Sequence, residues 1–271
     1  MKNRAVATPF ALWMAIFTIV PMAIVVWFAF TDENGAFTLQ NITEIWMYAG
    51  TYADSIWMGA LATVICLVLA YPIALSISRK AEHMQRTMVM IVMLPMWMNF
   101  LLRTYAWMTL LEDNGLINQF LGLFGAEMHL INTDAAVVLG MVYNFLPFMI
   151  LPLYSVMAKM DNRVIEAAQD LGSNYWQVLR RVILPLSAPG IVSGVTMVFV
   201  PAVSTFVISK LLGGSKNMMI GDVIESIFMG DGSNYNAGAA LSLLLMVLML
   251  LCMSLMRRVD SGEDDIGGLM A

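Results

Sequence analysis

The sequence predicts an all-α polytopic membrane protein, and three observations lead to this fold class. First, 60% of the 271 residues are hydrophobic and only 12% are charged, which is about half the charged fraction of an ordinary soluble domain. Second, the apolar residues gather in six runs, each close to the length of about 20 residues that a helix needs to cross a bilayer. Third, the basic residues cluster between alternate runs, as they do on the cytoplasmic side of membrane proteins.

The six predicted spans form one transmembrane domain over residues 1–271. They cover about residues 9–30, 55–78, 87–111, 135–157, 189–209 and 237–256. The first run is longer than the apolar part of a signal peptide, and no small-x-small cleavage site follows it. We therefore expect it to be an uncleaved span.

The distribution of lysine and arginine predicts the orientation of the chain. If the six spans alternate, 11 of the 14 basic residues lie on one side, and the other side keeps Arg103, Lys210 and Lys216. We therefore expect both termini, residues 173–179 and the whole loop 158–188 to be cytoplasmic, and residues 213–217 to be external. The outward loops carry eleven acidic residues. This charge either gathers a cationic ligand or only reflects the retention of bases on the inner side.

Proline and glycine residues inside the runs predict kinked, closely packed helices. Six of the nine prolines lie within spans, and each removes a backbone donor and tends to kink its helix. They are Pro21, Pro72, Pro95, Pro147, Pro152 and Pro201. Gly190 and Gly194 form a small-xxx-small pair that lets another helix approach closely.

Several kinds of chemistry have no signal in the sequence. No acidic residue lies well inside a span, which argues against an ion-coupled carrier, and no G-x-x-x-x-G-K-[ST] loop is present for ATP. We find no nucleophile–base pair, no metal or cofactor motif, and no basic block for nucleic acid. We expect a chain without catalytic residues, and Cys66 and Cys252 to be free thiols.

The loop between the fourth and fifth spans reads as a helix–turn–helix. Asp161 is expected to cap a first helix, on which Val164, Ile165, Ala168 and Leu171 share one face. Gly172 suits a helix end that needs positive φ. Ser173 is expected to cap a second helix over residues 174–183, which Pro185 and Pro189 end. These residues alone fit either a docking surface or a helix pair resting on lipid headgroups.

The same loop resembles the EAA loop of bacterial ABC-importer permeases. The residues that carry the likeness are Glu166, Ala167, Ala168, Gly172, Leu184 and Pro185, with Val182 where the family pattern has Ile. Residues 94–107, 140–161 and 211–224 also resemble the spermidine/putrescine permeases of the PotB type. The resemblance implies a MetI-like fold in the inner membrane and contact of these loop residues with a cytoplasmic ATPase. The partners that it implies are a second, PotC-like permease subunit, a PotA-like ATP-binding dimer and a PotD-like external binding protein.

Aromatic and amide side chains are the candidates to line a passage for a polyamine, because cations are attracted to the faces of aromatic rings. They are Trp97, Asn99, Tyr105, Trp107, Tyr143 and Asn144. The alternative is that the aromatic residues form an interfacial belt. Arg103 fits a cation path poorly. It either snorkels to the membrane surface, pairs with an acid or contacts the binding protein.

Together these features predict the permease subunit of an ABC importer, with polyamines as the substrate that the resemblance implies. Such a subunit provides half of the passage and couples it to ATP hydrolysis on another chain. One alternative is an importer permease for another small solute, such as an opine, an amino acid or ferric iron. Others are a stand-alone secondary carrier and, less consistent with the kinked spans, a structural membrane anchor.

Overall fold

The computed structural model describes residues 4–32, 34–125, 128–214, 217–230 and 234–267, and within these ranges the regular secondary structure is helical. An isolated bridge joins Thr31 and Phe37. The predicted external stretch 213–217 falls partly outside the described residues. The helices in chain order are α1 (Arg4–Ala29), α2 (Gln40–Glu44), η1 (Ile45–Tyr48), α3 (Ala49–Ser78), α4 (Glu82–Met93), η2 (Leu94–Trp97), α5 (Phe100–Leu111), α6 (Leu116–Gly122), α7 (Asp134–Met157), α8 (Asn162–Asp170), α9 (Tyr175–Val178), η3 (Leu179–Ile183), α10 (Leu184–Leu186), α11 (Ala188–Ser204), α12 (Val207–Leu212), α13 (Ile220–Met229) and α14 (Tyr235–Gly267).

By length and composition, four helical segments in the described ranges can cross a membrane: Leu12–Ala29, Gln40–Ser78, Asp134–Met157 and Tyr235–Met256. Two bent pairs pass the same test when each pair is taken together, which makes six in all. The first pair is Glu82–Trp97 with Phe100–Gly122, bent by 84°, and the second is Tyr175–Leu186 with Ala188–Ser204, bent by 66°. The all-α polytopic fold class is therefore confirmed.

The third and fifth predicted ranges are not continuous helices. In the third, α4 gives way to η2 at Leu94, because Pro95 lacks the N–H that an α-helix needs. Asn99 then starts α5 by accepting from the backbone N–H of Leu101. In the fifth, α11 ends at Ser204, and α12 begins only at Val207 after an extended Thr205. Both breaks lie within apolar sequence, where a count of hydrophobic residues detects no interruption.

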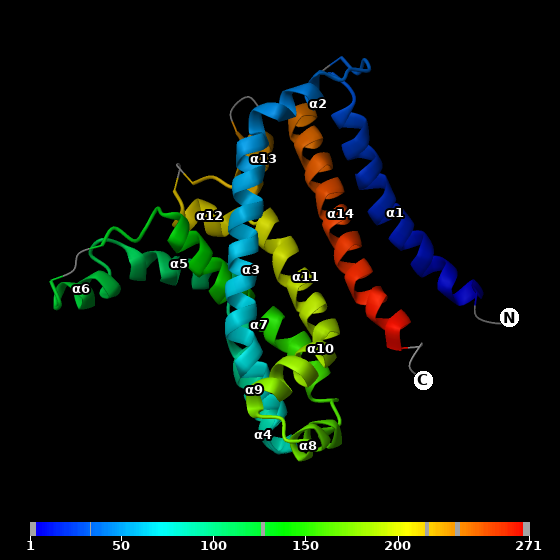
Figure 1. Cartoon of the computed structure of the whole chain (residues 1–271). Coiled ribbons are helices and arrows are strands. Elements are labelled where there is room, and N and C mark those ends of the chain that lie inside the picture. The colour runs from blue at the N-terminus through cyan, green and yellow to red at the C-terminus, as the bar shows by residue number, and fades with distance from the viewer. Residues whose placement is uncertain (1–3, 33, 126–127, 215–216, 231–233, 268–271) are drawn as a thin grey trace.

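The core of the molecule is a tight trio of α3, α7 and α11 (Figure 1). Small residues on α3, including Ala62, Cys66 and Ala70, are fully buried. Cys66 and Cys252 are both free, as predicted. The predicted close approach at Gly190 and Gly194 is also confirmed. A Cβ at Gly194 would lie 2.6 Å from Met149 Sδ, and one at Gly190 would lie 3.1 Å from the Pro152 carbonyl oxygen of α7.

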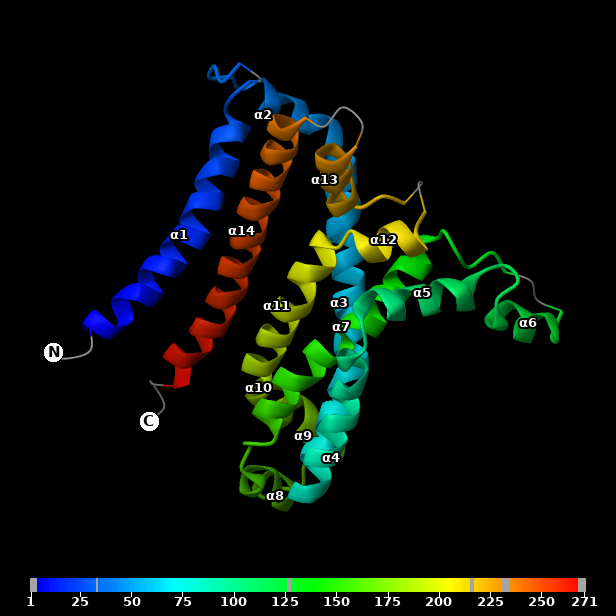
Figure 2. The same ribbon diagram turned by 180° about the vertical axis from the view of Figure 1, so that it is seen from behind.

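Helices α1 and α14 form a separate pair beside this trio, whereas α5 and α6 extend from the opposite flank (Figures 1 and 2). The pair is joined near its upper end in Figure 1 by Ala29, Ala239 and Ala240, and Asn236 Nδ2 donates to the Phe28 carbonyl oxygen at 3.1 Å. The start of α1 and the end of α14 point toward the end of the molecule that holds α8. Helices α2, α12 and α13 lie toward the other end.

Candidate functional site

The turn between α8 and α9 is built almost as the sequence predicts. Asp161 Oδ1 accepts from the Arg163 N–H at 2.9 Å and so caps α8. Gly172 has a φ of +83°. The Ser173 N–H donates to the Ala168 carbonyl oxygen at 3.1 Å and the Gly172 N–H to that of Gln169 at 2.8 Å, which is the bonding pattern of a Schellman helix end.

The predicted cap of the second helix is wrong by one residue. Asn174, not Ser173, caps α9: its Oδ1 accepts from the Gln177 N–H, and Gln177 Oε1 accepts from the Asn174 N–H, both at 2.9 Å. A capping box consists of two reciprocal hydrogen bonds, and the second one needs a Glu or Gln side chain three residues after the cap. Residue 176, three positions after Ser173, is a tryptophan and cannot complete it.

The predicted helix end at Pro185 is also wrong. The helix continues from α9 through the π-turn η3 into α10, and Pro185 lies directly after the π-turn, at the start of α10. The chain bends at Ser187, whose hydroxyl lies 3.0 Å from the Tyr71 hydroxyl of α3. Pro189 lies in the first turn of α11, which agrees with the predicted start of the fifth span at residue 189.

The predicted apolar face of α8 is split between the protein core and the surface. Ile165 and Ala168 pack against the core, whereas Val164 and Leu171 are exposed, Leu171 by 87%. Neighbouring helices cover only part of the predicted face of α8. Ile165 and Ala168 lie on the covered part, and Val164 and Leu171 lie outside it.

The surface at this end of the bundle combines the EAA residues with exposed apolar side chains. Glu166 and Ala167 are exposed, as are Leu184 and Pro185. Tyr175 and Trp176 are exposed by 68% and 66%. Contiguous exposed apolar groups with a polar rim are typical of an interaction site. We call the exposed surface of residues 161–186 the coupling surface.

Three hydrogen bonds connect the coupling surface and its neighbours to the core helices. Arg79 Nη1, just after α3, donates to Asn162 Oδ1 at 2.5 Å. The contact between Tyr71 and Ser187 joins α3 to the bend before α11, and the Tyr154 hydroxyl of α7 donates to Gln85 Oε1 of α4 at 3.0 Å. The bond between Arg79 and Asn162 therefore joins the start of α8 to the end of α3.

The candidate passage residues fall into separate groups. Trp107 and Tyr143 are brought together, with their rings edge to face and the ring centres 5.3 Å apart. Asn144 is buried, donates to the Gly140 carbonyl oxygen at 2.9 Å and leaves Oδ1 without a partner among the described residues. Trp97 and Tyr105 are exposed. Asn99 is used as the cap of α5.

Arg103 does not snorkel. Only 8% of the residue is exposed, and its Nε and Nη1 have no hydrogen-bond partner within the described ranges. A buried guanidinium without acceptors is costly. The burial of Arg103 argues against snorkelling, and no described acid pairs with it, so contact with the binding protein stays a prediction.

The structure also reveals a buried carboxyl group that sequence reasoning assigned to an outward loop. Asp222 on α13 is only 2% exposed. Its Oδ2 accepts from the Met219 N–H at 2.8 Å, and its Oδ1 has no partner among the described residues. Burial raises the pKa of the Asp222 carboxyl above its usual range, although the nearby Ser209 hydroxyl, the Met219 N–H and the charge of Lys210 act in the opposite direction.

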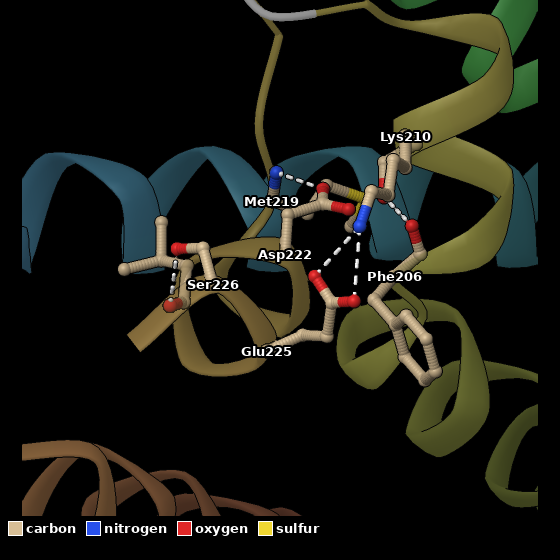
Figure 3. Close-up of polar contacts among 8 residues, drawn as sticks. Phe206, Lys210, Met219, Asp222, Glu225 and Ser226 are labelled. Carbon is tan, nitrogen blue, oxygen red and sulfur yellow. Dashed lines mark hydrogen bonds and ion pairs between the residues drawn. The ribbon is translucent and has the colours of Figure 1, made fainter. Parts of the chain in front are cut away.

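Lys210 and Glu225 complete this cluster (Figure 3). Lys210 Nζ donates to Glu225 Oε2 at 2.8 Å and to Oε1 at 2.9 Å. This hydrogen bond raises the pKa of the Lys210 ammonium. Two features of the sequence could have indicated the cluster. Lys210 is one of only three bases predicted outside, and Asp222 and Glu225 are three residues apart on a short amphipathic helix.

Comparisons with known proteins agree with this architecture. The family described as binding-protein-dependent transport system inner membrane component matches residues 3–263. The spermidine/putrescine transport system permease protein PotB of Haemophilus influenzae is 39% identical over 250 residues, which cover 88% of this chain and 87% of the relative. PotB of Escherichia coli K12 is 35% identical over 248 residues, which cover 88% and 90%.

Solved structures show the same fold at low sequence identity. A bacterial ABC transporter involved in the import of the acidic polysaccharide alginate has a chain that matches with a TM-score of 0.74 at 18% identity, covering 94% of each chain. A chain of the inward-facing MetNI methionine ABC transporter matches with a TM-score of 0.60 at 18% identity, covering 80% of this chain and 96% of that one. This chain therefore belongs to the family of binding-protein-dependent transport system inner membrane components, and it is a multi-pass inner membrane protein with the MetI-like fold of ABC-importer permeases.

Proposed function

We propose that this chain is the permease subunit of an ATP-driven importer of polyamines. The observation that carries the proposal is its 39% and 35% identity to two PotB spermidine/putrescine permeases over 88% of its length. The fold alone does not select a substrate, because chains of the same fold occur in transporters for alginate and for methionine. The evidence for polyamines is therefore the sequence relationship, with the acidic residues of the predicted outer loops in support.

In this proposal the coupling surface is the docking site for the ATPase. Gly172 supplies the tight turn, and Glu166 offers an acceptor to a donor on the partner, while Leu171, Tyr175 and Trp176 supply apolar contact area. ATP hydrolysis takes place on a PotA-like dimer, so this chain contributes no catalytic residue. The contact of Arg79 with Asn162 and that of Tyr71 with Ser187 carry the motion of α8 to α3 and α11.

The passage itself is shared with a second, PotC-like permease subunit, and a PotD-like binding protein delivers substrate from outside. From this chain, Trp107, Tyr143 and Asn144 are the residues we assign to the passage. The edge-to-face ring pair offers π-electron density to a cation, and Asn144 Oδ1 offers an acceptor that no described residue occupies.

The proposal also requires the coupling surface to face the cytoplasm and α12–α13 to face outward. Single cysteines at Asn174 and at Asn114, both exposed positions, test this orientation in a background without Cys66 and Cys252. An impermeant thiol reagent is expected to label the Asn114 position from outside the cell and the Asn174 position only after the membrane is opened. Labelling of both from one side contradicts the orientation.

Transport in cells that carry the chain with its cognate partner subunits tests the function. Uptake of labelled spermidine is expected, it is expected to be competed by unlabelled spermidine or putrescine, and it is expected to stop when the ATPase subunit is absent. Competition by neutral or anionic solutes alone overturns the polyamine assignment and leaves an importer of another substrate. Uptake that continues without the ATPase overturns the importer assignment in favour of a secondary carrier.

A further inference from the structure

Two carboxylates and one ammonium group meet where α12 contacts α13 (Figure 3). Asp222 and Glu225 are separated by three residues and so lie on one face of α13, and Figure 3 shows both beside Lys210 of α12. Lys210 Nζ bonds both oxygens of Glu225. Among the described residues the cluster therefore holds two acids and one base, and the acid that lacks a partner for one oxygen is the more deeply buried one.

The unpartnered oxygen of Asp222 points to a ligand independently of the excess of acids in the cluster. A buried carboxylate oxygen without a hydrogen bond is costly, and Asp222 Oδ1 is such an atom within the described residues. The Ser209 hydroxyl lies close enough to Asp222 to lower its pKa, but its hydrogen bond goes to the Phe206 carbonyl oxygen at 3.2 Å and leaves Oδ1 without a partner. A donor supplied from outside the chain would satisfy this oxygen.

The Lys210 side chain is itself chemically close to one end of a polyamine. It is a primary ammonium on a chain of methylene groups, and it is held by one acid. Its side chain is 59% exposed, and that of Glu225 is 27% exposed. Ion pairs this accessible to solvent contribute little to stability, so an incoming ammonium group can replace Lys210 at small cost.

A hollow of about 380 Å³ has Glu225 in its lining. Its lining is mainly apolar and includes Ile224, Leu245, Met246 and Met249. Such a surface suits the methylene segments of an extended alkylammonium ion, with the charged end at Glu225. The hollow and the two carboxylates together therefore have the composition that a flexible polycation needs.

We propose that Asp222 and Glu225 form an ammonium-binding subsite for the transported cation, and that Lys210 occupies this subsite when no substrate is present. The inference rests on the proposed function, since it names a subsite for the same substrate class. When a substrate ammonium arrives, it takes over the bonds to Glu225, Lys210 swings into solvent, and Asp222 Oδ1 gains a donor or a nearby positive charge. Lys210 thus excludes monovalent cations that compete weakly and yields to a polycation.

Equilibrium binding of labelled spermidine to the purified complex of both permeases and the ATPase, reconstituted in nanodiscs without the external binding protein, tests the proposal. Glu225→Gln is expected to weaken binding about tenfold, the loss of one charge-assisted hydrogen bond, and Glu225→Asp to recover part of the affinity. Asp222→Asn, which keeps an acceptor for the Met219 N–H, is expected to weaken binding by a smaller factor. Lys210→Met is expected to tighten binding, because it removes the competing ammonium group.

The opposite signs of the Lys210 and Glu225 variants separate this proposal from a purely structural ion pair. If the pair only joins α12 to α13, both substitutions break the same bond and change affinity in the same direction, which overturns the proposal. Asp113→Asn is the matched control, because it removes one exposed acid from the predicted outer side, and this acid pairs with His129 rather than with Lys210. An equal loss of affinity in this control assigns the effect to the overall charge and also overturns the proposal.

Failure of the proposed subsite can be distinguished from failure of the proposed transport function. If the wild-type system takes up spermidine and Glu225→Gln binds it as tightly as wild type does, only the subsite is overturned. If the wild-type system takes up no polyamine, the proposed function fails, and the subsite fails with it. Thermal stability of each purified variant, measured alongside, shows whether a loss of affinity comes from loss of the fold.

Discussion

The α8–α9 turn and the α12–α13 turn are two pairs of short helices toward opposite ends of one bundle, and they are built in opposite ways (Figure 1). None of the residues of helix α8 is fully buried, and the cap of α8, the end of α8 and the cap of α9 are hydrogen-bonded within the turn itself. Helix α13 buries Ile220, Gly221 and Asp222 at its first turn and leaves a carboxyl oxygen without a partner in the described chain. An exposed turn can contact a protein partner without a change in the fold, whereas a buried turn with an unpartnered carboxyl oxygen has the character of the small-ligand subsite proposed above.

The largest effect on transport is expected from substitutions on the coupling surface, which change the contact with the ATPase but not the fold. Glu166→Lys and Gly172→Val are expected to abolish uptake and to weaken co-purification of the ATPase, while the protein remains in the membrane. Glu166 is exposed, and a β-branched residue at the φ of +83° found at Gly172 adds about 1–2 kcal/mol of strain to a surface turn.

Glu82→Lys is the control for this prediction. It makes the same change of charge at an exposed site of α4, which lies near α8 in both views, and it is expected to retain uptake. Normal uptake and ATPase association in both loop variants would make the coupling surface an ordinary interfacial helix pair.

The same glycine-to-alanine change at the two turns tests the contrast in burial. A Cβ at Gly221 would lie 2.5 Å from the Thr205 carbonyl oxygen and 2.7 Å from that of Ser204, whereas a Cβ at Gly172 meets nothing within 4 Å. We expect Gly221→Ala to lower the free energy of unfolding by about 1–3 kcal/mol through overpacking. Gly172→Ala is expected to cost about 1 kcal/mol through strain at its positive φ alone.

Thermal unfolding of the two purified variants measures this difference. Equal losses of stability would show that the α13 turn tolerates a side chain as readily as the surface turn does. They would remove the physical basis for treating the two turns as different.

A smaller effect is expected at the cap of α9. Asn174→Ala removes the side-chain half of the capping box, the acceptor for the Gln177 N–H, and leaves the backbone N–H of residue 174 that donates to Gln177 Oε1. It is expected to destabilise the short helix by about 1 kcal/mol. Hydrogen exchange of the amides of residues 175–178 is expected to accelerate. Ser173→Ala is the matched control and is expected to leave exchange unchanged, because Asn174 supplies the cap; acceleration in the control alone would restore Ser173 as the capping residue.

The smallest effect is a pH dependence at Asp222. Its pKa is raised by burial, so the folded protein holds this proton to a higher pH than the unfolded chain does. Wild-type stability is therefore expected to fall as the pH rises from about 4, the usual pKa of an aspartic acid, through the raised pKa, and then to level off.

Asp222→Asn keeps the acceptor for the Met219 N–H but does not titrate in this range. The difference in melting temperature, variant minus wild type, is expected to grow across this pH window. A difference that stays constant with pH would mean that the Asp222 carboxyl has the same pKa in the folded and the unfolded chain.

The EAA turn was predictable because its determinants are local. Asp161 and Gly172 act through hydrogen bonds and φ angles within a few residues of themselves, so their roles follow from their spacing. The error at Ser173 is also local, since Gln177 three residues after Asn174 already indicates the true cap. The family relationship follows from the same short-range pattern, carried by residues that the fold leaves exposed.

The α12–α13 cluster could not be predicted in this way. Lys210 and Glu225 are 15 residues apart in the sequence, and they meet because the chain breaks at Thr205 and turns back at Met219. The apolar sequence around Thr205 contains no signal for this break. The proline of this run, Pro201, lies four residues before the break and inside α11.

The sequence by itself therefore determined the all-α class, the number of apolar spans, the EAA turn and the family, because hydrophobic length and local backbone chemistry act over short distances. The tertiary structure alone decided that α4–α5 and α11–α12 are broken helices, that Arg103 is buried, and that Asp222 faces Lys210 rather than solvent. Burial of a charged group depends on which distant segments close over it. That choice is made by the packing of α3, α7 and α11, in which residues such as Gly194 and Met149 touch across more than 40 positions of sequence.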